Sequence, residues 1–404
     1  MAENQALKIL IIGYGGGEIT FLSRLVKGLA DAGLQLTVTS PKRKNPKLLM
    51  HPNIHRLKTP PWVGPFPIRI LNLIRLFITK FSFQRLGWLK NQVQNGNNQR
   101  QRLVYLNRYL PFMRGEWDVI YFPWNSAAIG YRGLYDLNIP VVVSCRGSQV
   151  NIRPYLPGQD KYVQGLKESL LRAAKVHCVS WEIQAEASQF GLDPRKSVII
   201  HPAVDPGFFM PVKTKHSHLY FRLITTGSLI WRKGYEYLLL SIRSLIDKGV
   251  DAELDIIGGG PMRQSILFTI DDLALGDRIT LHGRVPPDQV RDLLQNAEVF
   301  VISSLSEGIS NAVLEAMSCG LPVVTTNCGG MAEAVSDGVE GFVVPLRDPD
   351  SFTSALTKLH ADPALRDRMG IAGRDKIIKI FTLQNQVYQF KDLFMQTASL
   401  KGKE

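Results

Sequence analysis

The hydrophobic positions of this chain fall into short apolar runs of strand length that alternate with segments of helical spacing. A strand buried on both faces of a parallel sheet shows such a continuous apolar run, because helices cover both sides of it. The runs lie at residues 8–12, 37–40, 119–122, 141–144, 176–179, 198–200, 223–226, 253–257, 279–284, 299–302 and 323–326. Strands that alternate with helices in this way predict an α/β protein with doubly wound parallel sheets.

The most informative stretch is 299–344, which predicts strand, acidic loop, short helix, strand, glycine turn, helix and strand. Glu307 lies in the loop, and Glu315 lies on the helix that Asn311 begins. At a rise of about 1.5 Å per helical residue, the two acids are on the order of 10 Å apart, comparable to the span from a nucleotide's ribose to a sugar on its diphosphate. The free backbone N–H groups of residues 308–311 suit the diphosphate itself. Two solvated acids at a helix start would show the same spacing, so the pair alone decides nothing.

The full string from Ser306 to Val324 resembles the donor-site signature of the retaining family 4 glycosyltransferases, which have the GT-B fold. The resemblance continues through Cys328 to Glu333 and through Asp337 to Gly341. It implies two Rossmann-like domains that face a central cleft, and the transfer of a sugar from a nucleoside diphosphate to an acceptor hydroxyl. The nucleotide sugar is then a substrate, and the resemblance implies neither a cofactor nor a metal.

The domain boundaries also follow from the resemblance, because residues 201–205 are similar to the hinge sequence of that family. At 404 residues the chain is long enough for two domains with separate cores. We predict an acceptor-binding domain over 1–205, with a basic insert at about 42–92, and a nucleotide-sugar-binding domain over 206–380. The segment 381–404 contains a predicted helix at 383–397, which is expected to cross back to the first domain as it does in the family.

The predicted donor site lies in the second domain. Arg232 and Lys233 stand at the entrance of a helix predicted for 235–246, where two cations can clamp a diphosphate and where the family uses a matching pair. The resemblance places the nucleobase against the backbone of the loop 283–285. The predicted catalytic residues are Glu307, Arg232 and Lys233, and the predicted donor-binding residues are Gly15, Gly16, Gly17, Gly227, Arg232, Lys233, Gly283, Val285, Glu307, Gly308, Ile309, Ser310, Asn311 and Glu315.

Glu315 is expected on the ribose and Glu307 on the sugar side. Three roles stay open for Glu307 and its surroundings. The carboxylate acts as a nucleophile, or it stabilises the cationic sugar, or the departing phosphate itself accepts the proton of the acceptor.

The first glycine loop, Gly13 to Gly17, follows a strand and precedes a helix, as in sites that bring backbone N–H groups close to a phosphate or sugar. Glu18 stands where the dinucleotide fingerprint needs its third glycine, which argues against an NAD-dependent oxidoreductase.

In the family this first glycine loop lies at the cleft, and the strand matching 141–144 runs into a His-Gly pair near the acceptor. Arg146 and Gly147 occupy those positions here, so the acceptor side carries a cation for a phosphate or acidic sugar instead of a histidine base.

The net charge of +13 resides in the N-terminal part of the chain. Residues 1–118 hold 18 basic residues against 5 acidic ones, and no acid lies between residues 32 and 115. This surplus predicts an anionic partner for that half. The segment 68–83 is predicted to form a basic amphipathic helix whose apolar side consists of Ile70, Ile74, Phe77, Ile78 and Phe81. Two alternatives stay open: this side packs on the N-terminal sheet, or it contacts an anionic membrane surface that carries a lipid-linked acceptor.

Four cysteines without a CxxC pair favour a reducing compartment, and neither a signal peptide nor a stretch long enough to span a bilayer is visible. We therefore expect a cytoplasmic protein, peripheral on the inner face of the plasma membrane if the helix at 68–83 binds lipid.

Asp348-Pro349-Asp350 looks like the metal-binding Asp-x-Asp of another glycosyltransferase fold, but we interpret it as the cap of a helix at 351–360. No metal is expected, because His216 and His218 have no cysteine or acid nearby.

These features predict a retaining hexosyltransferase of cell-surface polysaccharide or glycolipid synthesis, with a saccharide or lipid-linked acceptor and without nucleic acid as a partner. The rival hypothesis is a non-catalytic protein that binds an anionic polymer through its basic N-terminal domain. That hypothesis leaves the donor signature unexplained. A glucan phosphorylase shares the fold but needs a pyridoxal phosphate lysine, which no motif indicates.

Overall fold

The computed structural model describes residues 6–13, 21–40, 50–59, 66–212 and 219–401, and these divide into two compact units. Unit 1 contains the chain up to Cys178, then Gln184–Ile200 and the chain from Val387 on. Unit 2 contains Val179–Ile183 and His201–Gln386. We predicted boundaries after residues 205 and 380, whereas the units divide after residues 200 and 386.

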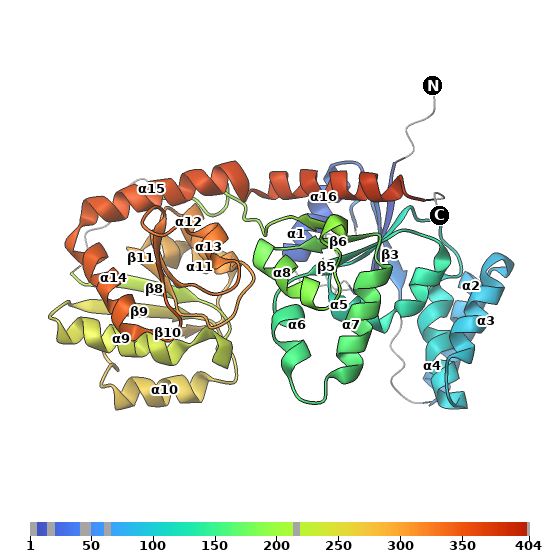
Figure 1. The fold of residues 1–404 in the computed structure, drawn as a ribbon, viewed down its shortest axis with the longest axis horizontal. Coiled ribbons are helices and arrows are strands. Elements are labelled where there is room, and N and C mark those ends of the chain that lie inside the picture. The colour runs from blue at the N-terminus through green and yellow to red at the C-terminus, as the bar shows by residue number, and fades with distance from the viewer. Residues whose placement is uncertain (1–5, 14–20, 41–49, 60–65, 213–218, 402–404) are drawn as a thin grey trace, which may run out of the picture. The chain divides into compact units, whose positions relative to one another are not determined.

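Unit 1 is built on a seven-stranded parallel sheet with the strand order β3-β2-β1-β4-β5-β6-β7 (Figure 1). The helix α1 (Phe21–Asp31) and the second half of α16 (Leu383–Ala398) pack on one face through Leu25, Phe390 and Phe394. The strands are β1 (Lys8–Ile11), β2 (Gln35–Ser40), β3 (Ile54–Lys58), β4 (Val119–Phe122), β5 (Val141–Cys145), β6 (Lys175–Cys178) and β7 (Ser197–Ile199).

The remaining elements of unit 1 are short helices inserted between the strands. Among them, α5 and α7 pack on β5. They are α2 (Phe66–Lys80), η2 (Phe83–Arg85), α3 (Leu86–Gln94), α4 (Gln99–Tyr109), η3 (Leu110–Phe112), α5 (Asn125–Gly130), η4 (Arg132–Leu137), α6 (Ser148–Asn151), η5 (Arg153–Tyr155), α7 (Asp160–Arg172), η6 (Pro194–Lys196) and most of α8 (Trp181–Gln189).

Unit 2 is built on a six-stranded parallel sheet with the order β10-β9-β8-β11-β12-β13. Successive residues of β11 alternate between two apolar clusters, because helices cover both faces. Val299 and Val301 join the cluster of α9, α10 and α14, whereas Phe300 and Ile302 join that of α11, α12 and α15. The strands are β8 (Phe221–Thr226), β9 (Ala252–Ile257), β10 (Ile279–Gly283), β11 (Val299–Ile302), β12 (Val323–Thr326) and β13 (Gly341–Val344).

The helices of unit 2 confirm the predicted order of elements around the acidic loop, and Asp348 caps α14 as predicted, since its side chain accepts from Ser351 N at 2.9 Å. The His216 and His218 prediction lies outside the described residues. The helices are η7 (Trp231–Lys233), α9 (Tyr235–Asp247), α10 (Arg263–Asp272), α11 (Pro287–Gln295), α12 (Asn311–Ser318), α13 (Met331–Ala334), α14 (Pro349–Ala361) and α15 (Pro363–Ile380).

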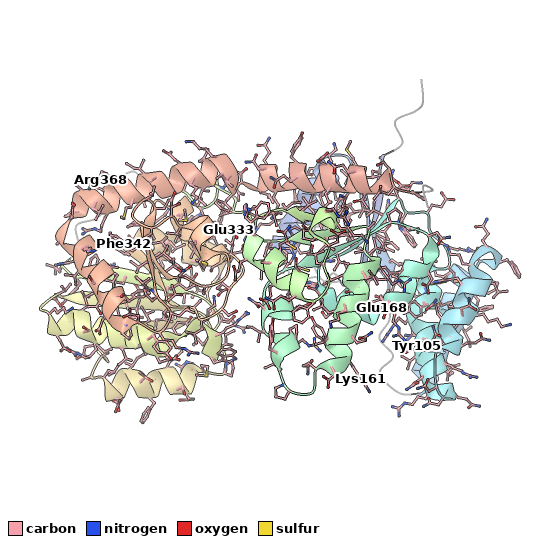
Figure 2. The ribbon with its side chains drawn as sticks, viewed as in Figure 1. Tyr105, Lys161, Glu168, Glu333, Phe342 and Arg368 are labelled. Carbon is pink, nitrogen blue, oxygen red and sulfur yellow. The ribbon has the colours of Figure 1, made fainter. Side chains whose placement is uncertain are left out.

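Residues 179–183 belong to unit 2, and Glu333 of α13 in the same unit (Figure 2) contacts two of them. Its Oε1 accepts from the backbone N–H of Trp181 at 2.9 Å, at the start of α8. Its Oε2 lies 3.0 Å from Nε2 of His201. A carboxylate at a helix N-terminus is favoured by the helix dipole, so Glu333 contributes both hydrogen bonds and a charge interaction. From sequence, Glu333 stood out only as part of a signature.

The predicted amphipathic helix is α2, and its buried residues lie outside the set named as its apolar side. Leu73 and Leu76 are buried, and α2 packs through this side against η3. Of the predicted apolar side, Ile74, Phe77 and Ile78 are exposed, at 51%, 51% and 72%. No helix among the described residues is long and apolar enough to cross a membrane.

Candidate functional site

The loop after β8 positions the two predicted cations. It runs from Gly227 through η7 to Gly234, whose φ of +60° is left-handed and which leads into α9. A Cβ on Gly234 would lie 2.4 Å from the carbonyl oxygen of Ser303, so only glycine allows this approach. Ser303 Oγ in turn donates to the carbonyl of Gly234 at 2.9 Å, and Leu305 N donates to the carbonyl of Arg232 at 2.7 Å. These bonds tie the cationic loop to the acidic loop that follows β11.

Lys233 and Glu307 form an ion pair between the ammonium and Oε1. Their side chains are only 11% and 12% exposed. Ser304 Oγ donates to the same Oε1 at 3.2 Å. Burial beside this carboxylate also raises the pKa of Tyr235, chiefly through desolvation and secondarily through the charge of Glu307, so the phenol stays neutral. We predicted Lys233 on a diphosphate and Glu307 on a sugar, but not that the two contact each other.

Arg232 contributes a second cation with a donor that the protein leaves unused. Its Nε is buried and has no hydrogen-bond partner within the described part of the chain. A buried donor without a partner is costly, and such groups are a feature of binding sites. Arg232 therefore fits the diphosphate role that the sequence predicted for it.

A glycine turn holds the backbone of the acidic loop in place. Gly330 N donates to the carbonyl of Gly308 at 2.7 Å. Gly329 has a φ of +52°, and a Cβ there would lie 1.9 Å from the carbonyl oxygen of Glu307. Behind this turn, Ile309 and Ser310 are buried and α12 begins at Asn311, as predicted. Ser310 makes no side-chain cap, so the first backbone N–H groups of α12 are not bonded by their own N-cap.

We expect Gly329→Ala to displace Glu307 and to lower turnover more than tenfold. The left-handed backbone costs an alanine about 1–2 kcal/mol, and the overlap with the Glu307 carbonyl adds to that. Gly338→Ala is the matched control, since Gly338 has a φ of +78° but nothing within 4 Å of the added Cβ. Turnover and thermal unfolding of both variants measure the difference. Equal behaviour of the two variants would show that the contact with Glu307 has no consequence.

A cavity of about 350 Å³ adjoins these loops at the carboxyl ends of β8 and β9. Ligands of open parallel sheets bind at this edge. The cavity brings together three residues predicted for the donor, namely Gly227, Val285 and Glu315. Lys233 passes over Gly227, because a Cβ on that glycine would lie 3.3 Å from Lys233 Cε. The cavity and the Lys233–Glu307 pair are therefore neighbours.

Two glycines line the cavity without having been predicted as site residues, and Arg284 lines it with its side chain, whereas only the backbone of its loop was predicted to contact the donor. Gly258 has a φ of +148°, and a Cβ there would lie 1.7 Å from the carbonyl of Gly227. Arg284 lies over Gly259, with Cγ 3.2 Å from the position of an added Cβ. The signal in the sequence was the glycine turn after β9, which we did not connect with the donor. Gly283 is close by, since its carbonyl accepts from Gly258 N at 2.8 Å.

The predicted acceptor-side residues Arg146 and Gly147 lie in unit 1, at the carboxyl end of β5. The Arg146 guanidinium lies 4.4 Å from the ring centroid of Phe21 and donates from Nη2 to Tyr121 Oη at 3.2 Å. A buried chain continues from Tyr121 Oη to Ser144 Oγ (2.8 Å) and from there to His177 Nδ1 (2.7 Å). This chain fixes the Arg146 head. Gly147 has a φ of +90° and precedes α6. The predicted Gly15, Gly16 and Gly17 lie outside the described residues.

No group of three or more His, Cys, Asp and Glu residues that could hold a metal ion occurs within the described ranges. The charged groups that the structure brings together in unit 2 are Arg232, Lys233, Glu307, Arg284 and Glu315. They form a cationic and acidic site beside a glycine-lined cavity, which suits a ligand with both phosphates and hydroxyl groups.

Known proteins share these features. Residues 210–376 match the family model "Glycosyl transferases group 1", and residues 92–208 match "Glycosyltransferase Family 4". The chain is 30% identical over 188 residues to the GDP-mannose-dependent alpha-(1-6)-phosphatidylinositol monomannoside mannosyltransferase of Mycolicibacterium smegmatis, a match that covers 43% of this chain and 49% of that protein. The matches span between 37% and 65% of the length of four curated relatives, so the chain covers only part of them.

Solved structures show the same architecture. A sucrose-phosphate synthase from Thermosynechococcus elongatus superposes with a TM-score of 0.76 at 19% identity, over 97% of this chain and 99% of that one. HepE from Anabaena in complex with UDP superposes with a TM-score of 0.71 at 16% identity, over 97% and 100%. The fold is thus GT-B, with two Rossmann-like parallel-sheet domains. Together with the family models, this shows that the chain belongs to the group 1 glycosyltransferases, the family 4 type of the GT-B fold.

Proposed function

We propose that the chain transfers a hexose from a nucleoside diphosphate sugar to an acceptor hydroxyl, with retention of configuration. The observation that carries the proposal is the buried Lys233–Glu307 pair beside the cavity that holds Glu315 and Val285. This arrangement provides a cation for the diphosphate, an acid for the sugar and a second acid for the ribose within one unit.

The electrostatic task of such a transfer is to stabilise the charges that separate when the glycosidic bond breaks. Negative charge develops on the diphosphate, where Arg232, Lys233 and the first N–H groups of α12 are available. Positive charge develops on the sugar, which Glu307 faces in this proposal. A diphosphate competes with Glu307 for the Lys233 ammonium, so donor binding weakens the ion pair and leaves the carboxylate more negative toward the sugar.

Two routes remain for the retained configuration. In one, Glu307 attacks the sugar and forms a covalent intermediate. In the other, the acceptor attacks from the side of the leaving group, whose phosphate takes the proton. Incubation with a slow fluorinated donor followed by mass spectrometry separates them, because only the first route leaves a sugar on the peptide that contains Glu307.

The test of the proposed function begins with thermal shifts in UDP, GDP and ADP, and continues with nucleotide release from the corresponding sugars. UDP is the first choice, since the similar HepE structure contains it, and GDP is the second, since the mycobacterial relative is named for GDP-mannose. NMR of the product gives the anomeric configuration. The rival hypothesis of a non-catalytic polymer-binding protein predicts no nucleotide release with any donor.

We also propose that unit 1 binds an anionic membrane surface through α2. The exposed side chains of Leu71, Ile74, Phe77 and Ile78 form an apolar surface on this helix. Arg75 is exposed there too, and the surrounding segment from residue 32 to residue 115 contains no acid. Apolar side chains flanked by cations are typical of helices that lie in a lipid interface. A mycobacterial relative named for a phosphatidylinositol mannoside supports a lipid acceptor.

We expect the protein to float with phosphatidylserine vesicles at low salt and to dissociate partly as the salt concentration rises. Each basic residue near the surface contributes about 1 kcal/mol, and salt screens that term while the apolar term persists. Phe77→Glu with Ile78→Glu should abolish flotation, because two apolar contacts become repulsive charges. The control is Phe268→Glu on α10, a side chain that is 71% exposed in unit 2. If flotation does not change with salt concentration, or if the doubly substituted protein still floats, α2 is not the membrane contact.

A further inference from the structure

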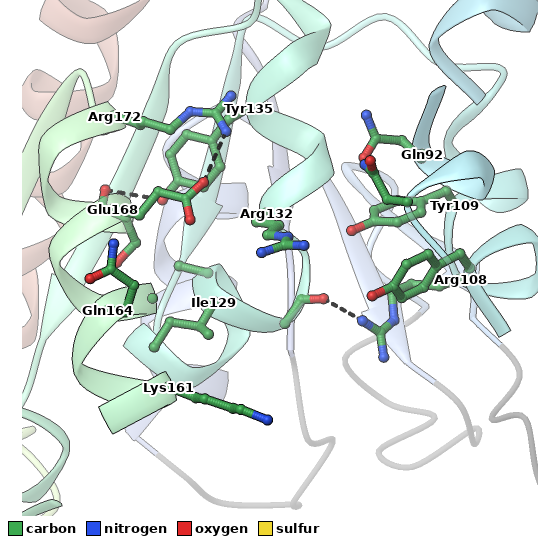
Figure 3. A pocket seen from close by; sticks show the side chains of 16 residues that line it. Gln92, Arg108, Tyr109, Ile129, Arg132, Tyr135, Lys161, Gln164, Glu168 and Arg172 are labelled. Carbon is green, nitrogen blue, oxygen red and sulfur yellow. Dashed lines mark hydrogen bonds and ion pairs between the residues drawn. The ribbon is translucent and has the colours of Figure 1, made fainter. Parts of the chain in front are cut away.

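Unit 1 contains a cavity of about 380 Å³ between α4, α5, η4 and α7 (Figure 3). The described donor residues belong to unit 2, and neither Arg146 nor Gly147 lines this cavity. Tyr105 of α4 stands on one side, and Lys161 and Glu168 of α7 stand on the other (Figure 2). A volume of this size matches a sugar-sized ligand.

The cavity carries more positive charge than its acids neutralise. Four cations line it, namely Arg108, Arg132, Lys161 and Arg172, against one acid, Glu168. Arg172 is neutralised, because it forms ion pairs with Asp136 at 2.5 Å and with Glu168 at 3.4 Å. Within the described part of the chain, the other three cations form no ion pair with an acid. Three cations without an ion-pair partner among the described residues therefore face one space, and the four lining cations together with Glu168 and Asp136 carry a net charge of +2.

Arg108 is held in position without being neutralised. Its Nη1 donates to the carbonyl of Gly130 at 2.7 Å, and its guanidinium lies 5.7 Å and 5.6 Å from the ring centroids of Tyr105 and Tyr131. Burial raises the pKa of Tyr131, so this phenol stays neutral and adds no negative charge. In Figure 3, Arg132 and Lys161 extend into the space between α7 and Arg108. Three cations thus line one volume, and one of them is held by a hydrogen bond and two aromatic rings.

The walls of the cavity supply groups that suit a sugar ring. Tyr105 offers an aromatic face, and Gln164 offers an amide with two donors and an acceptor. Along one wall, α5 and α7 approach closely at Gly165, where a Cβ would lie 2.7 Å from Ile129 Cγ2. Hydroxyl groups can pair with neutral donors while an oxyanion takes the cations.

We propose that this cavity binds a phosphorylated saccharide, with the phosphate held by Arg108, Arg132 and Lys161 and the sugar held against Tyr105 and Gln164. A net charge of +2 favours a dianionic phosphate over a neutral sugar or a single carboxylate. The phosphate belongs either to a soluble sugar phosphate or to a phosphorylated inositol lipid headgroup, which present the same chemistry. Neither source requires the donor reaction proposed for unit 2, so the inference does not rest on that function.

The test uses the full chain and the paired substitution Arg132→Gln with Lys161→Gln. Both residues are exposed, so their replacement should leave the fold intact. Calorimetric titration with glucose 1-phosphate should show binding that the pair weakens about a hundredfold, at about tenfold for each cation. Lys90→Gln with Lys167→Gln is the matched control, because both are exposed cations of unit 1 outside the cavity and should leave the affinity unchanged. Flotation with vesicles containing phosphatidylinositol 4-phosphate tests the lipid source with the same variants, made in the Phe77→Glu, Ile78→Glu protein so that α2 does not contribute.

The proposal is supported if the Arg132→Gln, Lys161→Gln variant loses binding to glucose 1-phosphate or to the vesicles while the Lys90→Gln, Lys167→Gln control keeps it. The probe whose binding is lost identifies the source of the phosphate. The Arg232→Ala variant assigns the location, since a sugar phosphate bound at the donor site would be lost there instead. Three results overturn the proposal: binding that Arg232→Ala removes and the cavity variant retains, no binding of either probe up to about 10 mM, or inorganic phosphate binding as tightly as the sugar phosphate, which would mean an adventitious ion only.

Discussion

Glu307→Gln should lower kcat by about 10²–10³-fold while changing the dissociation constant of the nucleoside diphosphate by less than about threefold. Glutamine has the same shape as glutamate, and its amide oxygen can still accept the hydrogen bond from Ser304 Oγ. What disappears is the negative charge that stabilises a cationic sugar or attacks it. Because that charge matters only as the glycosidic bond breaks, its removal affects turnover more than ground-state binding.

The ion pair sharpens this expectation. In the variant the Lys233 ammonium has no carboxylate to neutralise it, so it is free to bind the diphosphate more strongly. Nucleotide affinity should therefore stay level or rise as kcat falls. Glu236→Gln is the control, since Glu236 is an exposed acid in the first turn of α9. Initial rates and nucleotide titration on both variants measure the separation. A parallel loss of affinity and turnover in Glu307→Gln would mean that Glu307 serves only to hold Lys233.

The strands of unit 2 could be predicted closely because their sequences leave little choice. Residues 299–302 and 323–326 are β-branched or apolar runs buried on both faces, and they correspond to β11 and β12 without a shift. The edge strand β3 was missed and lies inside the predicted basic insert. Only Ile54 and Leu57 of this strand are buried, so its sequence lacks the continuous apolar run of a central strand. A strand could therefore be predicted when both of its faces are buried, and it was missed when it lies at the edge of the sheet and is only partly buried.

The grouping of residues in the candidate site could be predicted for a related reason. Its residues follow consecutive strands at one edge of a parallel sheet, so sequence order already groups them. The order of strands along the chain does not, however, predict which side chains of those loops contact each other. The Lys233–Glu307 pair joins residues 74 positions apart. It depends on hydrogen bonds to the backbone between the two loops, and no sequence pattern predicts these bonds. The same applies to the cavity of unit 1, where Arg132 and Lys161 come from separate polar segments that look like ordinary solvated surface.

Lys233→Ala should weaken nucleotide binding by about 10–100-fold and lower the free energy of unfolding by about 3–5 kcal/mol. The binding loss follows from removal of a charge-assisted hydrogen bond to the diphosphate. The stability loss follows from burial of the Glu307 carboxylate, which is 12% exposed and would have lost its cation. Arg232→Ala should weaken binding to a similar extent without the stability loss, because Arg232 forms no ion pair within the described residues.

The double variant Lys233→Ala with Glu307→Gln separates the two roles of Lys233. Removal of both charges leaves no uncompensated ion, so stability should return toward that of the unchanged protein while nucleotide affinity stays low. Lys248→Ala, an exposed lysine at the end of α9, controls for the loss of one positive charge from unit 2. Denaturant unfolding and UDP titration are measured on the unchanged protein, Lys233→Ala, Glu307→Gln and the double variant, which together form the double-mutant cycle, and on the Lys248→Ala control. If nucleotide affinity recovers together with stability, Lys233 acts only as the structural partner of Glu307, and the diphosphate must be held by Arg232 and the start of α12 alone.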